Sequence, residues 1–364
     1  MPPLVKLLYD PAKQYIGYEK KSVQHLEPGS EFNILTCAHR QEDAMAVVKL
    51  LGMTNPTKES RLCVYGLCLE ELVASSTPVL INHQLHQKTA LEFGSRSQPS
   101  LDIFNYFGDQ NSETTQISLF TAVSHLGQMY EDICRLAFTK AASFIVVPFH
   151  MKWNTKTKRF AQSSNEIRYL NVEVLNRAPC SVGILIDRRE TQGLSSLFVQ
   201  TTQCNVAMIF IGGEDDREAL AYSMRMAGSF RVDLTVVRCR FKTDQVQDSW
   251  EEILNSEALR KLKQQMMGSN NVHLNEVNIT DGAAIASVVH EMENCSDLII
   301  VGRRHSDDHK TLSQLSQWTE FGELGPIGDM LASEDIKSAV SVLVVQNQNM
   351  KAANSSLLNG SRVF

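Results

Sequence analysis

The residues best suited to chemistry lie where an apolar run gives way to a glycine and two arginines. In the stretch CSDLIIVGRRHSDD, residues 295–308, the apolar run ends at Gly302 and Arg303 follows it. A buried strand that leads into such a loop can present backbone N–H groups and cationic side chains to an anion. The chemistry to consider first is therefore the binding of an anion such as a nucleotide.

Strand-end geometry extends this loop to a candidate anion or nucleotide site in the second half of the chain. In an open parallel sheet, ligands gather at the carboxyl ends of the strands. The candidates are Gly212, Gly213, Asp215, Arg238, Gly302, Arg303, Asp329 and Ser333. The alternative is a solvated loop whose arginines are balanced by Asp307 and Asp308, with Asp215 and Asp216 as exposed loop or capping charges. Apart from such a nucleotide, no cofactor is predicted.

Other residue pairs point less clearly to chemistry. Cys37 and His39 share a face of a predicted strand, as half of a metal site would, but no second pair has suitable spacing. Core packing is therefore favoured and no metal is predicted. His83 and His86 could sense pH, although a solvated loop is the simpler interpretation. No G-x-S-x-G elbow and no Ser-His-Asp arrangement stands out, so enzyme activity is disfavoured.

The composition is that of an ordinary globular chain. Its 364 residues favour two domains, and 43% of them are hydrophobic and 21% charged. The net charge of −6 argues against a nucleic-acid partner, because such proteins usually carry a basic surplus. The eight cysteines form no CxxC pair and mostly lie within apolar runs, which suits reduced thiols in the cytosol.

Alternating strand and helix patterns predict two α/β units in tandem. Residues 32–187 and residues 205–346 are each predicted to hold five apolar strands separated by helices. This alternation indicates two five-stranded parallel sheets with helices on both faces. Residues 1–31 fit neither unit, residues 188–204 are the predicted linker, and residues 347–364 are a predicted flexible tail. The polar stretch 74–112 predicts a mobile loop.

The motifs DLIIVGRR and NRAPCSVGILID resemble the universal stress protein family, a small α/β fold that often binds ATP. The likeness covers about residues 32 to 187 and again 205 to 346. ATP-binding members carry G-x2-G-x9-G-[ST] after the fourth strand. Gly302 matches the first glycine, but His305 stands where the second should be, and Pro148 is the matching residue in the first half. The usual mode of ATP binding is therefore disfavoured.

The strand order of that family would place both fifth strands, VGILI and VSVLVV, at sheet edges. Both are apolar on each face, and unprotected apolar edges invite pairing. The two units are therefore predicted to pair with each other as an internal pseudo-dimer. Two separate domains on a linker are the alternative, and a homodimer is also left open.

Longer motifs, in the same order along the chain, resemble the cytosolic C-terminal region of plant monovalent cation/proton exchangers of the CHX type. They are PLVKLLYDPAKQYIGYEKKSVQH (3–25), VASSTPVLINH (73–83), YEDICRLA (130–137), FIVVPFH (144–150), VLNRAPCSVGILIDR (174–188) and GELGPIGDMLAS (322–333). One departure concerns the family's Thr-Met-His-Glu-Asp helix opening. Tyr130 replaces the histidine here, so pH sensing at that position is not expected.

This resemblance implies that residues 1–31 are a connector from a transmembrane transport domain that precedes the chain. The Lys and Tyr residues of KLLYDPAKQYIGYEKK suit the inner membrane surface. The expected partners are that transport domain and that surface, at the cytosolic face of an endomembrane or the plasma membrane. The implied function is regulation of the transport activity or targeting of a monovalent cation/proton antiporter, with potassium favoured, by ligand, pH or partner binding. The alternative is a free-standing tandem stress protein that binds a nucleotide.

Overall fold

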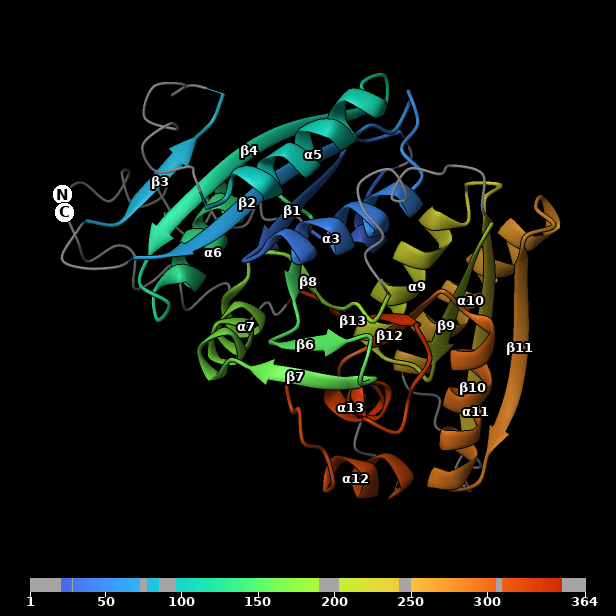
Figure 1. The fold of residues 1–364 in the computed structure, drawn as a ribbon. Helices are drawn as coiled ribbons and strands as arrows, with labels where there is room; N and C mark the ends of the chain where they lie inside the picture. Colours follow the sequence, from blue (N-terminus) through green and yellow to red (C-terminus); the bar gives the residue numbers. More distant parts are fainter. Residues whose placement is uncertain are drawn as a thin grey trace, which may run out of the picture.

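The computed structural model describes residues 21–27, 29–72, 77–84, 96–189, 203–241, 250–305 and 310–348 (Figure 1). After the 3-10 turn η1 (Val23–His25), the first half contains β1 (Phe32–Ala38), α3 (Gln41–Met53), β2 (Leu62–Glu71), β3 (Val79–Asn82), α5 (Gln98–Gln110), β4 (Thr115–Ser124), α6 (Met129–Thr139), β5 (Phe144–Pro148), β6 (Met151–Asn154), β7 (Arg159–Ser163), α7 (Asn165–Arg177) and β8 (Ser181–Ile186).

The second half repeats the alternation of strands and helices. It contains β9 (Cys204–Phe210), α9 (Glu214–Met226), β10 (Val232–Phe241), α10 (Trp250–Met267), β11 (Val272–Ile279), α11 (Gly282–Cys295), β12 (Leu298–Gly302), α12 (Lys310–Ser316), α13 (Gly325–Ala332) and β13 (Ser341–Gln346). Within the described ranges, no helix combines the length and apolarity that a membrane crossing needs.

Each half orders its five parallel strands in the same way, as third, second, first, fourth and fifth. The orders are β4-β2-β1-β5-β8 and β11-β10-β9-β12-β13. The strands β8, β12 and β13 are buried along their whole length, as their continuous apolar runs predict for parallel strands covered on both faces. The predicted pair of five-stranded parallel sheets is confirmed.

The fifth strands of the two halves pair antiparallel and join both sheets into one. The register runs from Val342 opposite Ile186 to Gln346 opposite Val182. Among the described residues, the result is one 11-stranded sheet, of which the short antiparallel strand β3 forms one edge. The predicted internal pseudo-dimer is therefore confirmed, and the alternative of two separate domains is wrong. We call the β8–β13 pairing and the contacts around it the seam.

Helices cover both faces of this sheet, and each hydrophobic core runs through both halves. One core gathers side chains of α3, α5, α9 and α10, and the other gathers side chains of α6, α7, α11 and α13 (Figure 1). The helix α9 of the second half also packs on the first half. Its Tyr222 ring stacks on Phe144 at 5.1 Å, and its Oη atom lies 3.0 Å from Thr54 Oγ1.

The mobile loop predicted for residues 74–112 is wrong for much of its length. It contains β3 and the helix α5, whose Leu101, Phe104 and Phe107 are buried. These residues lie at helical spacing, but serine, glutamine and asparagine around them mask the pattern. The β6–β7 hairpin was also not predicted from the sequence.

The seam needs glycine at position 183 in the middle of β8. A Cβ there would lie 2.9 Å from Leu343 of β13 and 2.9 Å from the Phe144 ring. We expect Gly183→Val to lower the free energy of unfolding by about 1–3 kcal/mol, because extra volume in a packed core forces strain. Urea denaturation followed by circular dichroism measures this. The control is Gly127→Val, where a Cβ meets open space. Equal effects of the two substitutions would show that the seam is not tightly packed.

Candidate functional site

The carboxylate of Asp216 lies at the centre of the predicted anion site of the second half. Its oxygens accept hydrogen bonds from the backbone N–H groups of Ile211 (2.7 Å), Gly212 (2.8 Å) and Gly302 (2.9 Å). Asp216 is fully buried. The chain thus places its own anion against the loop N–H groups that could otherwise face a phosphate.

Asp215 is a second internal anion beside Asp216. Its carboxylate accepts from the backbone N–H of Arg304 (2.9 Å), from two guanidinium nitrogens of the same residue (2.7 and 2.8 Å), and from the N–H of Asn347 (2.8 Å). The side chain is 1% exposed. The expectation that Asp215 and Asp216 are exposed loop or capping charges is therefore wrong, because the β12 loop closes over both.

The glycines of this site allow neighbouring segments of the chain to pack closely. A Cβ at Gly302 would collide with the Asp216 carboxylate and would lie 2.7 Å from the Asp216 backbone nitrogen. Gly212 and Gly213 have φ angles of 130° and 105°, a region that favours glycine. The Gly213 N–H donates to Asn255 of α10 at 3.1 Å.

Arg303 also turns into the protein. Its guanidinium donates to the carbonyl oxygens of Glu323 (2.8 Å) and Gly322 (3.1 Å) and to the side chain of Gln346 (2.7 Å). It thereby ties the end of β12 to the loop before α13 and to the end of β13. Burial is the main cause that lowers the pKa of Arg303 below its ordinary value.

The remaining predicted residues lie in other networks. Arg238 pairs with Glu252 and Glu276, Asp329 accepts from the Phe321 N–H at 2.6 Å, and the Ser333 hydroxyl accepts from the Asp335 N–H. The structure therefore gathers Gly212, Gly213, Asp215, Gly302 and Arg303 around the start of α9 and leaves these three apart. A nucleotide phosphate would reach the loop N–H groups only by displacing a resident carboxylate, so nucleotide binding here stays a prediction.

The first half repeats the internal carboxylate at the same place. Asp43, the third residue of α3 as Asp216 is the third of α9, accepts from the N–H groups of His39 (3.0 Å) and Arg40 (2.9 Å). Burial raises the pKa of Asp43. A carboxylate that caps the helix after the first strand is thus a shared property of both halves.

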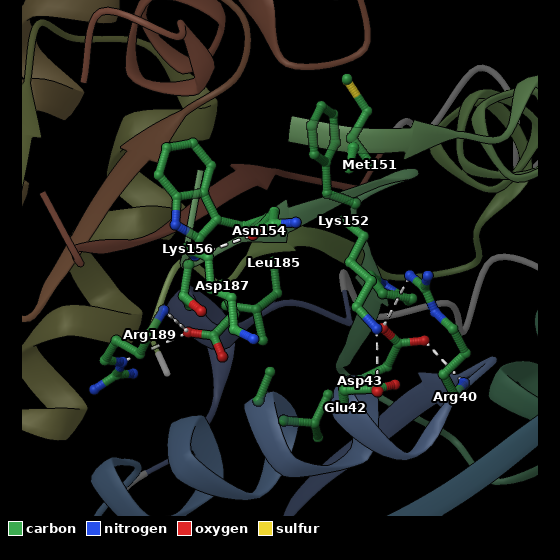
Figure 2. Close-up of a pocket in the computed structure, with 17 residues that line it drawn as sticks. Arg40, Glu42, Asp43, Met151, Lys152, Asn154, Lys156, Leu185, Asp187 and Arg189 are labelled. Carbon is green, nitrogen blue, oxygen red and sulfur yellow. Dashed lines mark hydrogen bonds and ion pairs between the residues drawn. The ribbon is translucent and has the colours of Figure 1, made fainter. Parts of the chain in front are cut away.

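A cavity of about 600 Å³ opens beside Asp43, at the carboxyl ends of β1, β5 and β8. Figure 2 shows it between the start of α3, the β6–β7 hairpin and the end of β8. Its charged lining residues are Arg40, Glu42, Asp43, Lys152, Lys156, Asp187 and Arg189. This cavity could not be predicted from the sequence, because the hairpin that covers it carries no motif.

A buried ionic cluster joins the two halves just after the end of β5. Glu323, in the loop before α13, lies 3.1 Å from His150 Nδ1 and 3.1 Å from Arg168 Nε of the first half. Burial alone would raise the pKa of Glu323, but hydrogen bonds from His150 and from backbone, together with the Arg168 charge, hold it below its ordinary value. Glu323 is therefore a charged contact between the two halves.

A third buried carboxylate, Glu218 of α9, holds the segment that precedes β1. It accepts from the backbone N–H groups of Val23 (2.6 Å) and Gln24 (3.1 Å) and from the hydroxyl of Ser181 at the start of β8. Burial raises the pKa of Glu218. This carboxylate therefore brings together the segment before β1, the first half and the second half.

The residues just after β13 reach the same place. The Lys21 N–H donates to Gln348 Oε1 (3.1 Å), and Gln348 Nε2 donates to the Pro179 carbonyl (2.7 Å). Asn347 and Gln348, at the start of the predicted tail, are buried. We call Glu218, Gln348 and their partners the entry contact.

The other candidates from the sequence are structural in the described part of the chain. Cys37 is fully buried, and burial raises the pKa of its thiol far above the ordinary value. Burial lowers the pKa of His39 to about 4. His83 is not in a solvated loop, since its Nε2 atom lies 2.8 Å from Thr121 Oγ1, whereas His86 lies outside the described residues. The described residues contain no group of three or more metal-ligating side chains.

Comparisons with known proteins show that this chain is similar to plant cation/H(+) antiporters. Residues 203–346 match the family model described as the plant cation/H(+) antiporter, C-terminal domain, and residues 64–190 match a plant cation/H(+) antiporter domain. Two similar proteins are cation/H(+) antiporters 9 and 3 of Arabidopsis thaliana. They are 39% identical over 357 residues and 36% identical over 361 residues. Each alignment covers 96% of this chain, which spans 44% of the length of each relative.

Among solved structures, the chain is similar to a universal stress protein from Archaeoglobus fulgidus. The TM-score is 0.47 at 14% identity, and the alignment covers 88% of this chain and 97% of that one. The fold described above rests on the strand order rather than on this likeness.

The internal anion of the second half can be tested by Asp216→Asn. An amide offers one acceptor oxygen where three backbone N–H groups now point, so two or more donors compete for it. We expect the free energy of unfolding to fall by about 2–4 kcal/mol, as for a broken buried charged contact. Chemical denaturation of this variant and of Glu214→Gln, an exposed residue at the start of α9, gives the comparison. A loss no larger than that of the control would contradict the assigned role.

The His305–Asp216 contact predicts a pH dependence of stability. The His305 Nε2 atom lies 3.3 Å from Asp216 Oδ1, and both side chains are buried. Burial alone would lower the pKa of His305, but Asp216 and Asp215 together raise it above its ordinary 6.5. A raised folded-state pKa gives stability that is complete below about pH 6.5 and is lost as the pH rises through the folded pKa.

We therefore expect the free energy of unfolding to fall as the pH rises above about 6.5, and His305→Asn to remove this fall. Denaturation curves at several pH values measure it. The control is His125→Asn, in the exposed turn before α6. A wild-type slope that survives in His305→Asn would assign the pH dependence to other groups.

Proposed function

The chain belongs to the plant cation/H(+) antiporter family, and from that premise we propose that it is a cytosolic regulatory region of such an antiporter. In this proposal the region controls the activity or the targeting of a transport domain for a monovalent cation, with potassium favoured. The transport domain and the inner membrane surface are its partners, and it stands at the cytosolic face of an endomembrane or the plasma membrane.

The observation that supports the proposal most is the entry contact. The segment that leads into β1 docks on the second half, through the buried Glu218, and only then enters the first half. If residues 1–31 connect to a transport domain, a movement of that domain is transmitted to the place where both halves meet. A change in how the halves pack would then change the position of the connector.

Regulation follows as a shift between two arrangements of the seam. A ligand, a proton or a partner that binds one arrangement better biases the connector by its difference in affinity for the two. The Glu323 cluster and the His305–Asp216 contact supply titratable groups close to the packed interior. The entry contact supplies the mechanical link to the preceding segment.

Glu218→Gln in the full-length antiporter tests this proposal. The amide keeps the shape of the side chain but meets the Val23 and Gln24 N–H groups with one acceptor instead of two. We expect cation-dependent proton flux in membrane vesicles to fall about five-fold at equal protein amount, the size of a typical coupling between sites. Parallel assays with potassium and with sodium test the cation preference.

The matched control is Glu214→Gln, on the same helix but exposed. Transport and membrane location should be unchanged in this variant. Wild-type flux and wild-type targeting in Glu218→Gln would remove the regulatory role of the entry contact.

A further inference from the structure

The cavity of the first half has the place and size of a small-molecule site. It lies at the carboxyl ends of neighbouring strands β1 and β5, whose following helices α3 and α7 pack on opposite faces of the sheet. Ligands of open α/β sheets bind at this point. Its volume of about 600 Å³ is within the range of ligand pockets.

The lining of the cavity is partly apolar and partly cationic. Ala46 and Val47 of α3, Leu185 of β8 and Pro148 of β5 supply apolar surface. Cationic side chains come from three separate segments: the turn after β1, the β6–β7 hairpin and the residues after β8 (Figure 2). The cavity therefore suits a molecule with both an apolar body and an anionic group.

The charges of the cavity do not cancel. Four cations, Arg40, Lys152, Lys156 and Arg189, stand against three carboxylates. Lys152 pairs with Glu42 at 3.1 Å. Among the described residues Lys156 has no ion pair, and the Nε atom of Arg40 is buried without a hydrogen-bond partner.

Each carboxylate already has a cationic partner in the cavity wall. Arg40 Nη2 lies 3.6 Å from Asp43 Oδ1, Lys152 pairs with Glu42, and Arg189 pairs with Asp187. Asp43 accepts the two backbone N–H groups at the start of α3, and Asp187 lies 3.5 Å from Arg189 and 3.9 Å from Lys49. The Ser341 hydroxyl also donates to Asp187. Among the described residues, the lining donors left without an acceptor are the Lys156 ammonium and the buried Arg40 Nε atom, and an entering anion would supply one.

We propose that this cavity binds an organic phosphate, with its phosphate between Lys152, Lys156 and Arg40 and its apolar body against Val47 and Leu185. A phosphate monoester carries up to two charges and several acceptor oxygens, so it can engage cations from different segments at once. This inference is independent of the proposed regulation, since it concerns binding to the chain itself.

The hairpin that carries two of these lysines is fixed against both halves. Trp153 packs on Phe160 at 5.0 Å, and the Arg188 guanidinium lies over both rings at 4.9 and 5.2 Å. Arg188 is buried and donates to the Ser333 carbonyl of the second half at 3.2 Å. The lysines therefore belong to a hairpin that is already held in place, which lowers the entropic cost of ordering them on binding.

Trp153 lines the cavity, so its fluorescence can report binding there. The chain has three tryptophans, and the other two, Trp250 and Trp318, are 70% and 86% exposed. In the 364-residue chain carrying Trp250→Phe and Trp318→Phe, emission arises from the cavity wall alone. The probes are AMP, glucose 6-phosphate, inorganic phosphate, and phosphatidylcholine vesicles with and without phosphatidic acid.

We expect a saturable change in Trp153 emission with an organic phosphate. Lys156→Ala should weaken that binding about three- to ten-fold, the worth of one charge-assisted contact. Lys263→Ala, an equal charge change on the exposed face of α10, should leave it unaltered. Saturation by AMP or glucose 6-phosphate identifies a soluble ligand, and saturation only by phosphatidic acid vesicles identifies a lipid headgroup.

Three results would overturn the proposal. The first is no saturable change with any organic phosphate, soluble or in vesicles. The second is saturation by inorganic phosphate alone, which would leave the apolar wall without a role. The third is equal weakening by Lys156→Ala and Lys263→Ala, which would indicate unspecific attraction by net charge.

Discussion

The antiparallel pairing of β8 with β13 is the constraint on which the rest of the structure depends. Both strands are buried on both faces, so neither could form a solvent-exposed sheet edge without leaving apolar surface and backbone groups open to aggregation. Their pairing closes both edges at once and lets each hydrophobic core continue from one half into the other. It also brings the residues after β13 close to the segment before β1, which is how Gln348 comes to meet Lys21.

Buried carboxylates are the second organising feature. Asp43, Asp216 and Glu218 each satisfy backbone N–H groups that would otherwise need water or a ligand, two at helix starts and one at the entry contact. Because the chain itself supplies the anion, these N–H groups are satisfied without a ligand. The cavity with a surplus of cations lies instead under the β6–β7 hairpin, so the two halves share a scaffold but not the same chemistry.

The fold could be predicted from sequence to the extent that a single local pattern encoded it. Continuous apolar runs such as LIIVG identified the parallel strands, and two doubly apolar fifth strands predicted the seam. The helix α5 was missed because its buried Leu101, Phe104 and Phe107 stand among polar residues. The burial of Asp215 and Asp216 could not be predicted, because it depends on Gly302 and the β12 loop closing over α9 from 86 residues away along the chain. The cavity was missed for a similar reason, since its lysines belong to a hairpin without a sequence motif.

Hydrogen exchange of the 364-residue chain tests the seam most directly, because each seam amide reports the free energy needed to open it. If the halves form one body, peptides from β8 and from β13 exchange together, in the slowest class, and more slowly than peptides from the outer strands β3 and β11. If β8 or β13 exchanges as fast as those outer strands, the fifth strands are not paired in solution, and the account of a single sheet that holds the entry contact is contradicted.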